Sequence, residues 1–446
     1  MTRRELLEAA GKAVEIALEK GFEEAAAKVV RTRSVMVKVF ENTLSVVQRW
    51  SQLNVDLYLA KDKRILVASA TPTRVEDIAQ LVSRLGEAAP KVKESFLYAP
   101  LPEPVNVSML GGLVDKAVLK AMENPSELAE EMVNAALGEG AERVAGMLSF
   151  AYRETSLVTS KGAELYEEST YMDTYVRAFA GRGSGQWSYG SPKYNGDKAV
   201  EAAKIAARYA VEAKEPSTLE PGTYDVILSP MVFGNLLNYV AFMSSAFYVL
   251  MGFSFLSKNK PGDHVASEVL TVYDDPRNRG LAGARSFDDE GIPTMSKPLI
   301  ERGVLRTFLH NTKTAVKMKT KTTGNAGWVS PHAWNLRVKP GDYKLEEMIR
   351  EVKRGVLITN NWYTRLQSYV EGIFSTIARD AAFLIENGEI VRPVEKFRIA
   401  DTFPRLLKNI SALTRETYDI WWWEVDVPTR APYVLAKEIN ISRHTI

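Results

Sequence analysis

A long run without any charged residue constrains this chain more than any other feature. The run, VILSPMVFGNLLNYVAFMSSAFYVLMGFSFLS, extends from Val226 to Ser257. A membrane-spanning helix needs about 20 predominantly apolar residues, but this run is interrupted by Pro230, Gly234, Asn235, Asn238, Ser244, Ser245 and Gly252. We therefore expect a buried strand over Tyr224–Leu228 and then, after Pro230, a helix enclosed within its own domain rather than a membrane span.

Length and composition leave room for such a buried helix. A chain of 446 residues can form two or three domains with large interiors. Its 57 Lys and Arg residues nearly balance 55 Asp and Glu residues, and the basic residues occur only in short groups, so no nucleic-acid partner is expected. The N-terminal residues indicate an amphipathic helix containing acids rather than a signal peptide, which predicts a cytoplasmic protein.

Helical and strand-like patterns alternate along the first half of the chain. Apolar residues at helical spacing predict a helix from Glu5 that stops near Gly21, and alternating β-branched and aromatic residues over Ser34–Thr71 predict antiparallel strands. The same order repeats after Asn124. A proline-bearing linker near residue 100 and the Pro/Gly-rich segment 216–222 separate the patterns. The predicted domains are therefore 1–100, 101–218 and 219–446.

One glycine-rich segment within the second range could suggest a phosphate-binding loop. The segment AGRGSGQWSYG covers residues 180–190. It lacks the GxGxxG spacing, and no Lys-Ser/Thr pair follows a GxxxxG as in a P-loop. We therefore predict a flexible loop here and no phosphate site.

Several specific motifs follow the uncharged run. They are ARSFDDEG at Ala284–Gly291 followed by Pro293-Thr294, Leu299-Ile300 with Gly303–Leu305, and TGNA at Thr323–Ala326, with FLIENGEIVRPVEKFRIA and RLLKNISAL further on. Together they resemble the TldD/TldE (PmbA) family of metalloproteases, historically labelled modulators of DNA gyrase. The resemblance is dense from about Gly222 to the end of the chain and looser before it.

The resemblance implies an α+β fold. Helices and antiparallel strands would form the N-terminal domain or domains, and a large, mostly antiparallel sheet system would form the C-terminal domain. Family members form dimers that enclose a cavity, and peptide substrates are thought to enter that cavity in an extended or unfolded form.

The resemblance also locates a zinc motif that this chain does not have. TldD-type subunits carry HExxxH on the helix after a strand similar to Val226–Leu228, and two imidazoles there share a zinc ion while the glutamate takes a proton from zinc-bound water. In this chain Asn238, Tyr239 and Met243 stand at the three positions.

No other residues replace the missing ligands. The four histidines, at 264, 310, 332 and 444, are too far apart for two to share a helix face, and the cysteine that serves TldD subunits as a further ligand is absent because the chain has none. The resemblance therefore implies a TldE-like subunit with no cofactor of its own, paired with a zinc-bearing TldD-like partner.

Four further residues are candidates for a substrate cleft: Asp288, Asp289, Glu290 and Asn325. The three successive acids could form an acid–base site, but acids before Gly291 and Pro293 are more often a solvated turn. The resemblance favours a role in shaping the family's cleft.

Three hypotheses for function remain open from the sequence. The favoured one is a non-catalytic subunit of a zinc peptidase that acts on peptides. The second is an independent hydrolase whose site uses acids such as Asp289 and Glu290 with a borrowed metal. The third is a peptide-binding scaffold without a protease partner. The sequence also leaves open a homodimer of this chain in isolation.

Overall fold

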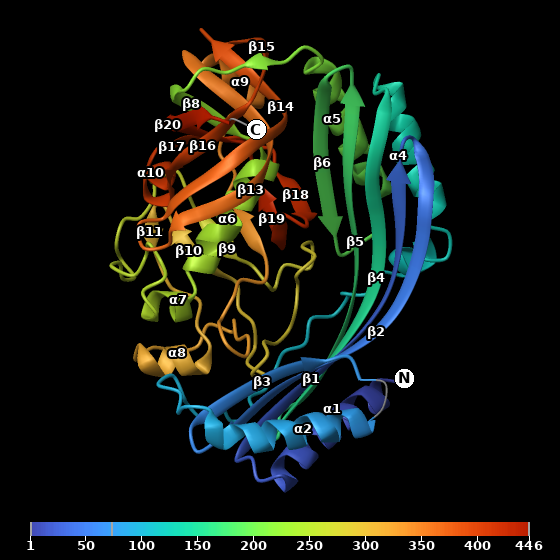
Figure 1. The fold of residues 1–446 in the computed structure, drawn as a ribbon, viewed down its shortest axis with the longest axis vertical. Helices are drawn as coiled ribbons and strands as arrows, with labels where there is room; N and C mark the ends of the chain where they lie inside the picture. Colours follow the sequence, from blue (N-terminus) through green and yellow to red (C-terminus); the bar gives the residue numbers. More distant parts are fainter. Residues whose placement is uncertain (1, 73–74, 445–446) are drawn as a thin grey trace.

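The structure, a computed structural model, describes residues 2–72 and 75–444. Helices and mostly antiparallel sheets make up this part of the chain, which confirms the predicted α+β class. Figure 1 shows a long, curved N-terminal sheet with helices near both of its ends, beside a C-terminal region built from two further sheets.

The N-terminal sheet has the strand order β3-β2-β1-β4-β5-β6, and all neighbours are antiparallel. Its strands are β1 (Glu24–Phe40), β2 (Thr43–Lys61), β3 (Arg64–Ala70), β4 (Arg143–Thr159), β5 (Glu164–Ala180) and β6 (Gly183–Ser191). Because β1 pairs with β4, the ranges 1–100 and 101–218 contribute to one continuous sheet. The boundary between these two ranges stays a prediction.

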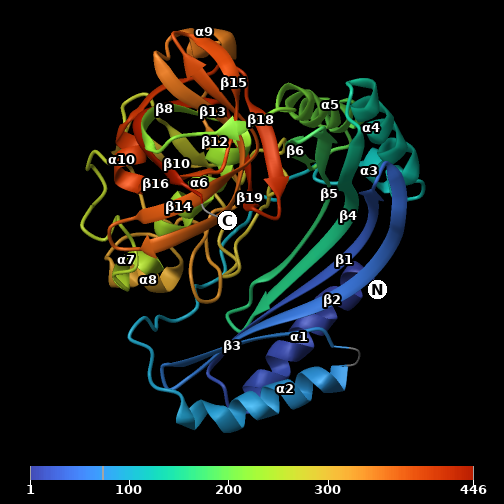
Figure 2. The same ribbon diagram turned by 45° about the horizontal axis from the view of Figure 1, so that its top comes forward.

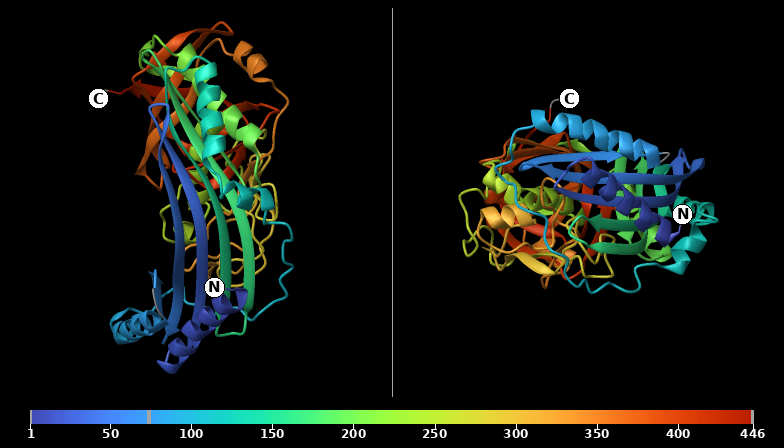
Figure 3. Two further views of the ribbon diagram at one scale, coloured as in Figure 1. Left: turned by 90° about the vertical axis from the view of Figure 1, so that its right-hand side faces the viewer. Right: turned by 90° about the horizontal axis from the view of Figure 1, so that it is seen from below.

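Helices cover this sheet near its two ends (Figure 3). They are α1 (Arg3–Glu19), α2 (Val75–Ala88) with a 3-10 turn at Ala89–Lys91, α3 (Lys116–Ala121), α4 (Ser126–Gly138) and α5 (Gly196–Glu212). Helix α1 ends just before Gly21, whose φ of 83° suits glycine, so the predicted stop is confirmed.

Strand β1 shows how the sheet divides its two faces. Ala25, Ala27 and Val29 are buried in one core cluster with residues of α1 and α2. Successive side chains of a strand point to opposite faces. The residues between them therefore lie on the other face, where Lys28 reaches Asp289 of the C-terminal region.

The predicted flexible loop at residues 180–190 is wrong, because most of it forms strand β6. Its glycines allow a helix to lie close to the strand: a Cβ at Gly185 would stand 2.2 Å from the Ala206 carbonyl oxygen of α5. The buried face of α5 consists of alanines at 199, 202, 203, 206, 207 and 210, so both surfaces are small.

Two sheets form the C-terminal region (Figure 2). One has the order β11-β10-β9-β12-β19-β18, and the other β13-β8-β20-β16-β14-β15-β7, with β17 paired to β20. The strands are β7 (Ser217–Thr218), β8 (Gly222–Leu228), β9 (Val272–Asp274), β10 (Lys297–Glu301), β11 (Val304–Leu305), β12 (Leu336–Val338), β13 (Arg354–Ser368), β14 (Ile373–Glu386), β15 (Glu389–Glu395), β16 (Phe397–Thr402), β17 (Ile410–Leu413), β18 (Tyr418–Trp422), β19 (Val425–Ala431) and β20 (Val434–Arg443).

The uncharged run is mostly buried in this region as far as Met243, whereas Met251 and Phe253 near its end are exposed. The C-terminal helices are α6 (Pro230–Met243), α7 (Ala246–Leu250), α8 (Thr312–Lys317), α9 (Leu345–Arg350) and α10 (Phe403–Lys408). Tyr224, Val226 and Leu228 of β8 are buried, as are most residues of α6, which confirms the predicted strand and enclosed helix. In the described ranges, no helix has the length and apolar character needed to cross a membrane.

Candidate functional site

A pocket of about 340 Å³ opens beside α6, at two of the three positions of the missing zinc motif. We call it the helix pocket. Its lining comes from α6, from the loop before β12, from the C-terminal end of β13, and from the β18–β19 turn with the start of β19. The residues are Asn238, Tyr239, Ala241, Phe242, His332, Ala333, Leu366, Tyr369, Trp423, Glu424, Asp426 and Val427. Helix α6 enters the site after Ser229, whose hydroxyl accepts from the Val232 N–H and donates to the Thr359 carbonyl.

Asn238 binds α6 to strand β19. Its Oδ1 accepts from the Val427 N–H at 2.8 Å, and its Nδ2 lies 3.1 Å from Thr429 Oγ1. The same Nδ2 donates to the Gly234 carbonyl at 2.9 Å. The amide at the first motif position is therefore used to hold the fold together.

The other two motif positions differ in where they lie. Tyr239 lines the pocket and donates from its hydroxyl to the Thr364 carbonyl at 3.0 Å. Met243 is fully buried at the C-terminal end of α6 and does not line the pocket. A side chain at position 243 therefore does not reach the same space as those at 238 and 239.

A buried polar network lies behind the helix pocket. Asn235 of α6 is 1% exposed, and its Oδ1 accepts from Asn361 Nδ2 at 2.8 Å and from the Thr364 hydroxyl at 2.7 Å. Its Nδ2 donates to the Glu424 carbonyl at 2.7 Å. This asparagine therefore fixes α6, β13 and the β18–β19 turn relative to one another, which positions three walls of the pocket.

Three titratable groups in the pocket were not found from the sequence. Burial raises the pKa of Glu424 and the pKa of Asp426, and burial lowers the pKa of His332. In each case the shift disfavours the charged form. Among the described residues, however, no group of three His, Cys, Asp or Glu side chains is arranged to hold a metal ion. The pocket therefore does not fit the family's zinc.

The acidic triplet is buried, so its interpretation as a solvated turn is wrong. Asp288, Asp289 and Glu290 are 1%, 6% and 2% exposed. Asp288 accepts backbone N–H groups from Glu290, Ile292 and Ala326 at 2.9–3.0 Å. Burial and the charge of Glu290 raise the pKa of Asp288, and these donors oppose the rise.

The other two acids of the triplet join distant segments. Asp289 forms an ion pair with Lys28 of β1 at 2.7 Å, and Glu290 forms one with Lys313 of α8 at 3.1 Å. Glu290 also accepts from the Thr312 N–H. The triplet therefore fastens the C-terminal region to the N-terminal sheet.

Asn325 lies in the interior and positions one wall of the helix pocket. Its Nδ2 donates to Asp274 Oδ2 at 2.7 Å and to the His332 carbonyl at 2.8 Å, and its Oδ1 accepts from the Thr323 hydroxyl. Because Asn325 is 0% exposed, its influence on a ligand would pass through His332. Its role in a substrate cleft stays a prediction.

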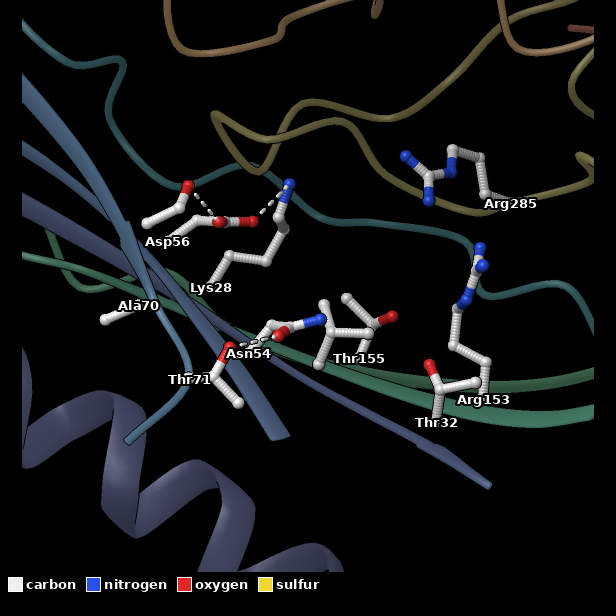
Figure 4. Close-up of a pocket in the computed structure, with 11 residues that line it drawn as sticks. Lys28, Thr32, Asn54, Asp56, Ala70, Thr71, Arg153, Thr155 and Arg285 are labelled. Atoms are coloured by element: carbon white, nitrogen blue, oxygen red, sulfur yellow. Dashed lines mark hydrogen bonds and ion pairs between the residues drawn. The ribbon is translucent and has the colours of Figure 1, made fainter. Parts of the chain in front are cut away.

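A second cavity, the sheet cleft, lies between the N-terminal sheet and the loop before the acidic triplet (Figure 4). Its volume is about 500 Å³, and mostly polar side chains on β1, β2 and β4 and at the end of β3 form its floor. They are Lys28, Val30, Thr32, Asn54, Asp56, Ser69, Ala70, Thr71, Arg153 and Thr155, with Arg285 opposite. The Trp334 indole contacts Arg285 of this cleft and His332 of the helix pocket.

Comparisons with curated proteins find several metalloproteases. A metalloprotease of Methanothermobacter thermautotrophicus is 28% identical over 355 residues, which cover 74% of this chain and 76% of that protein. A metalloprotease of Methanocaldococcus jannaschii is 29% identical over 270 residues, and the match spans 58% of this chain and 59% of that protein.

Solved structures show a similar fold. TldE from Thermococcus kodakarensis superposes with a TM-score of 0.84 at 22% identity, covering 97% of this chain and 100% of that one. Family models match as well: residues 221–443 fit the PmbA/TldA metallopeptidase C-terminal domain, and residues 116–214 fit the central domain. Because these matches span both halves of the chain, the protein belongs to the PmbA/TldD metallopeptidase family.

Proposed function

We propose that this chain is a non-catalytic, TldE-type subunit of a cytoplasmic peptidase, and that a TldD-type partner supplies the zinc. The proposal rests on the side chains of α6 at the three positions of the zinc motif. Asn238 is hydrogen-bonded into the fold, Tyr239 donates to a backbone carbonyl, and Met243 lies outside the helix pocket. A catalytic zinc site needs three protein ligands and an open position, and these three side chains do not supply it.

The helix pocket supports a role in substrate binding. Trp423, 56% exposed, the partly buried Glu424 and the exposed Asp426 line it together with Tyr239. Aromatic faces and polar groups that converge in a concave site are typical of ligand recognition. We propose that this chain contributes one wall of a cavity that receives unfolded peptides.

The independent-hydrolase hypothesis has weaker support. It assigned the reaction to acids such as Asp289 and Glu290, and both carboxylates are engaged by lysines in the fold. A buried carboxylate that already pairs with an ammonium in the fold is not available to a substrate without breaking that pair. The scaffold hypothesis differs from the favoured one only in lacking a protease partner, so co-purification separates them.

Peptide cleavage is expected only when this chain is mixed with a TldD-type partner. The assay compares casein cleavage by this chain, by the partner and by the mixture. We expect Asp289→Ala to lower the rate of the mixture about 10-fold, because a wall displaced by about 1 Å has effects of this size or larger, while the partner's zinc content stays unchanged.

The exposed Asp342 offers a matched control, and Asp342→Ala is expected to leave the mixture's rate unchanged. Robust, chelator-sensitive cleavage by this chain alone would overturn the proposal. Chelator-insensitive cleavage by this chain alone would contradict it too. In that case the pocket acids Glu424 and Asp426 would be candidate catalytic groups, and Glu424→Gln would test this.

The purified chain is expected to hold no stoichiometric zinc, and the triple substitution Asn238→His, Tyr239→Glu and Met243→His is expected not to create a tight site. The side chain at 243 points into the core, and the chain has no cysteine to serve as the family's further ligand. Elemental analysis after gel filtration checks both statements. About one zinc per chain in the unsubstituted protein would show that this chain does hold a zinc site and would refute the proposal.

A further inference from the structure

The sheet cleft contains two arginines that face the same space from different segments. Arg153 rises from β4 toward the loop that carries Arg285, and both side chains line the cleft (Figure 4). The floor between β1 and β4 is polar, with hydroxyls of Thr32 and Thr155 nearby. The cleft thus brings two guanidinium groups and neutral hydrogen-bonding groups together.

Neither guanidinium forms an ion pair within the described part of the chain, although other basic residues nearby do. Arg31 pairs with Glu154, and Lys28 pairs with both Asp56 and Asp289. The Nε of Arg153 is buried without a hydrogen-bond partner. A buried donor without a partner costs free energy. A ligand that accepts a hydrogen bond from it would remove this cost.

The acids nearest Arg285 are already occupied. Asp289 receives Lys28, and Glu167 accepts from the N–H and the hydroxyl of Ser286. Arg285 itself stacks on Trp334, with its Cζ 3.9 Å from the ring centroid. Burial lowers the pKa of Arg285, the charges of Asp289 and Glu167 oppose this effect, and the charge of Arg153 adds to it. Stacking leaves the edge of a guanidinium free to donate to a planar acceptor.

We propose that Arg153 and Arg285 form a binding site for the carboxylate of a peptide. A carboxylate matches the forked geometry of a guanidinium, and its charge would offset the repulsion between the two arginines. The cleft volume of about 500 Å³ admits a short peptide segment beyond the anchored group. The identity of the ligand as a peptide rests on the proposed function, whereas the anion site itself rests on the geometry of the cleft.

The test uses isothermal titration calorimetry on the full chain alone. Three probes separate the sources of the carboxylate: acetyl-Ala-Ala-Ala with a free C-terminus, its C-terminal amide, and acetyl-Ala-Asp-Ala amide. We expect a carboxylate-bearing peptide to bind at least about 10-fold more tightly than the neutral amide, because a charged hydrogen-bond pair contributes at least this much. Binding by the first probe identifies a C-terminal carboxylate, and binding by the third identifies an acidic side chain.

Substitutions link the binding to the two arginines. Arg153→Gln and Arg285→Gln are each expected to weaken binding of the carboxylate-bearing peptide at least about 10-fold. Arg153→Gln removes the repulsion from Arg285 but also the contact of the Arg153 guanidinium with the Tyr171 ring, so its thermal midpoint should change little. Loss of binding at a nearly unchanged midpoint cannot be ascribed to unfolding. Arg33→Gln is the matched control. Arg33 is exposed on β1 next to Thr32 but on the opposite face of the sheet, so this variant should bind the carboxylate-bearing peptide normally.

Several outcomes would overturn the inference. They are equal affinity for acid and amide, no binding of either carboxylate probe at about 10 mM, unchanged affinity in Arg153→Gln, and inorganic phosphate binding more tightly than both carboxylate probes. Because no partner subunit is present, a failed cleavage assay with normal peptide binding would reject the proposed subunit role alone. Normal cleavage by the mixture with no carboxylate-dependent peptide binding by this chain would reject the carboxylate site alone.

Discussion

Replacing Asp274 with alanine is expected to lower the free energy of unfolding of the C-terminal region by about 3–5 kcal/mol. Asp274 is fully buried at the end of β9. Its carboxylate pairs with Lys297 Nζ at 2.8 Å and accepts from Asn325 Nδ2 at 2.7 Å and from the Trp334 N–H at 2.9 Å. It also accepts from the Asn335 backbone N–H at 3.2 Å, so removing it leaves a buried ammonium and three other donors without this acceptor.

Urea unfolding followed by tryptophan fluorescence measures this loss, since most tryptophans lie in the C-terminal region. The double variant Asp274→Ala, Lys297→Met removes both charges and is expected to recover part of the loss. Asp342→Ala, at an exposed position, should stay within about 0.5 kcal/mol of the unsubstituted protein. A loss below about 1 kcal/mol for Asp274→Ala would show that the carboxylate does not hold this wall together.

The hydrogen bonds of Asp274 hold residues that border both cavities. Trp334 and Asn325, which it holds, contact Arg285 of the sheet cleft and the backbone of His332 in the helix pocket. A single buried carboxylate therefore orders the wall that the two cavities share. This arrangement explains how a substitution far from any ligand could alter both sites.

The enclosed helix could be predicted because its signals are local. Ser229 and Pro230 mark its start, and the apolar residues that follow are too often interrupted for a membrane span. The stop of α1 at Gly21 is similarly local, because glycine readily adopts a positive φ. Strand β6 shows the limit of such signals: its glycines resemble those of a loop, and only the packing of α5 shows that they allow close approach.

The surroundings of the acidic triplet could not be predicted in the same way. Asp288 to Glu290 followed by Gly291 has the local composition of a turn, and the backbone does turn there. Their burial depends on partners that are remote in sequence: Lys28 lies 261 positions from Asp289, and Ala326 lies 38 positions from Asp288. A single sequence contains no signal for such pairings.

The helix pocket illustrates the same limit for a candidate site. The motif frame on α6 identified Asn238 and Tyr239 as positions of interest, and both line the pocket. Glu424 and Asp426 were missed because alternating acids near a turn are typical of a solvent-exposed hairpin. Asn238 meets Val427 across 189 residues of sequence, and this contact brings the two acids to the pocket.

Replacing Phe403 with alanine is expected to lower the free energy of unfolding by about 3–5 kcal/mol. Phe403, the first residue of α10, is fully buried. Its ring stacks with those of Phe374, Phe255 and Tyr239 at centroid distances of 4.5, 5.9 and 6.3 Å. Truncation removes the burial and the aromatic contacts and leaves a cavity beneath the helix pocket.

The measurement is the urea midpoint of the C-terminal transition at an unchanged slope. Phe403→Leu, which keeps much of the volume, should lose no more than about 1.5 kcal/mol, and Phe40→Ala, at a ring that is 62% exposed, should lose no more than about 0.5 kcal/mol. Tyr239 and Phe255 both belong to the uncharged run, so Phe403 is one of the residues that hold this run as protein core. If Phe403→Ala were no more destabilising than Phe40→Ala, the run would not depend on α10 for its burial, and the packing that positions Tyr239 in the pocket would have to come from elsewhere.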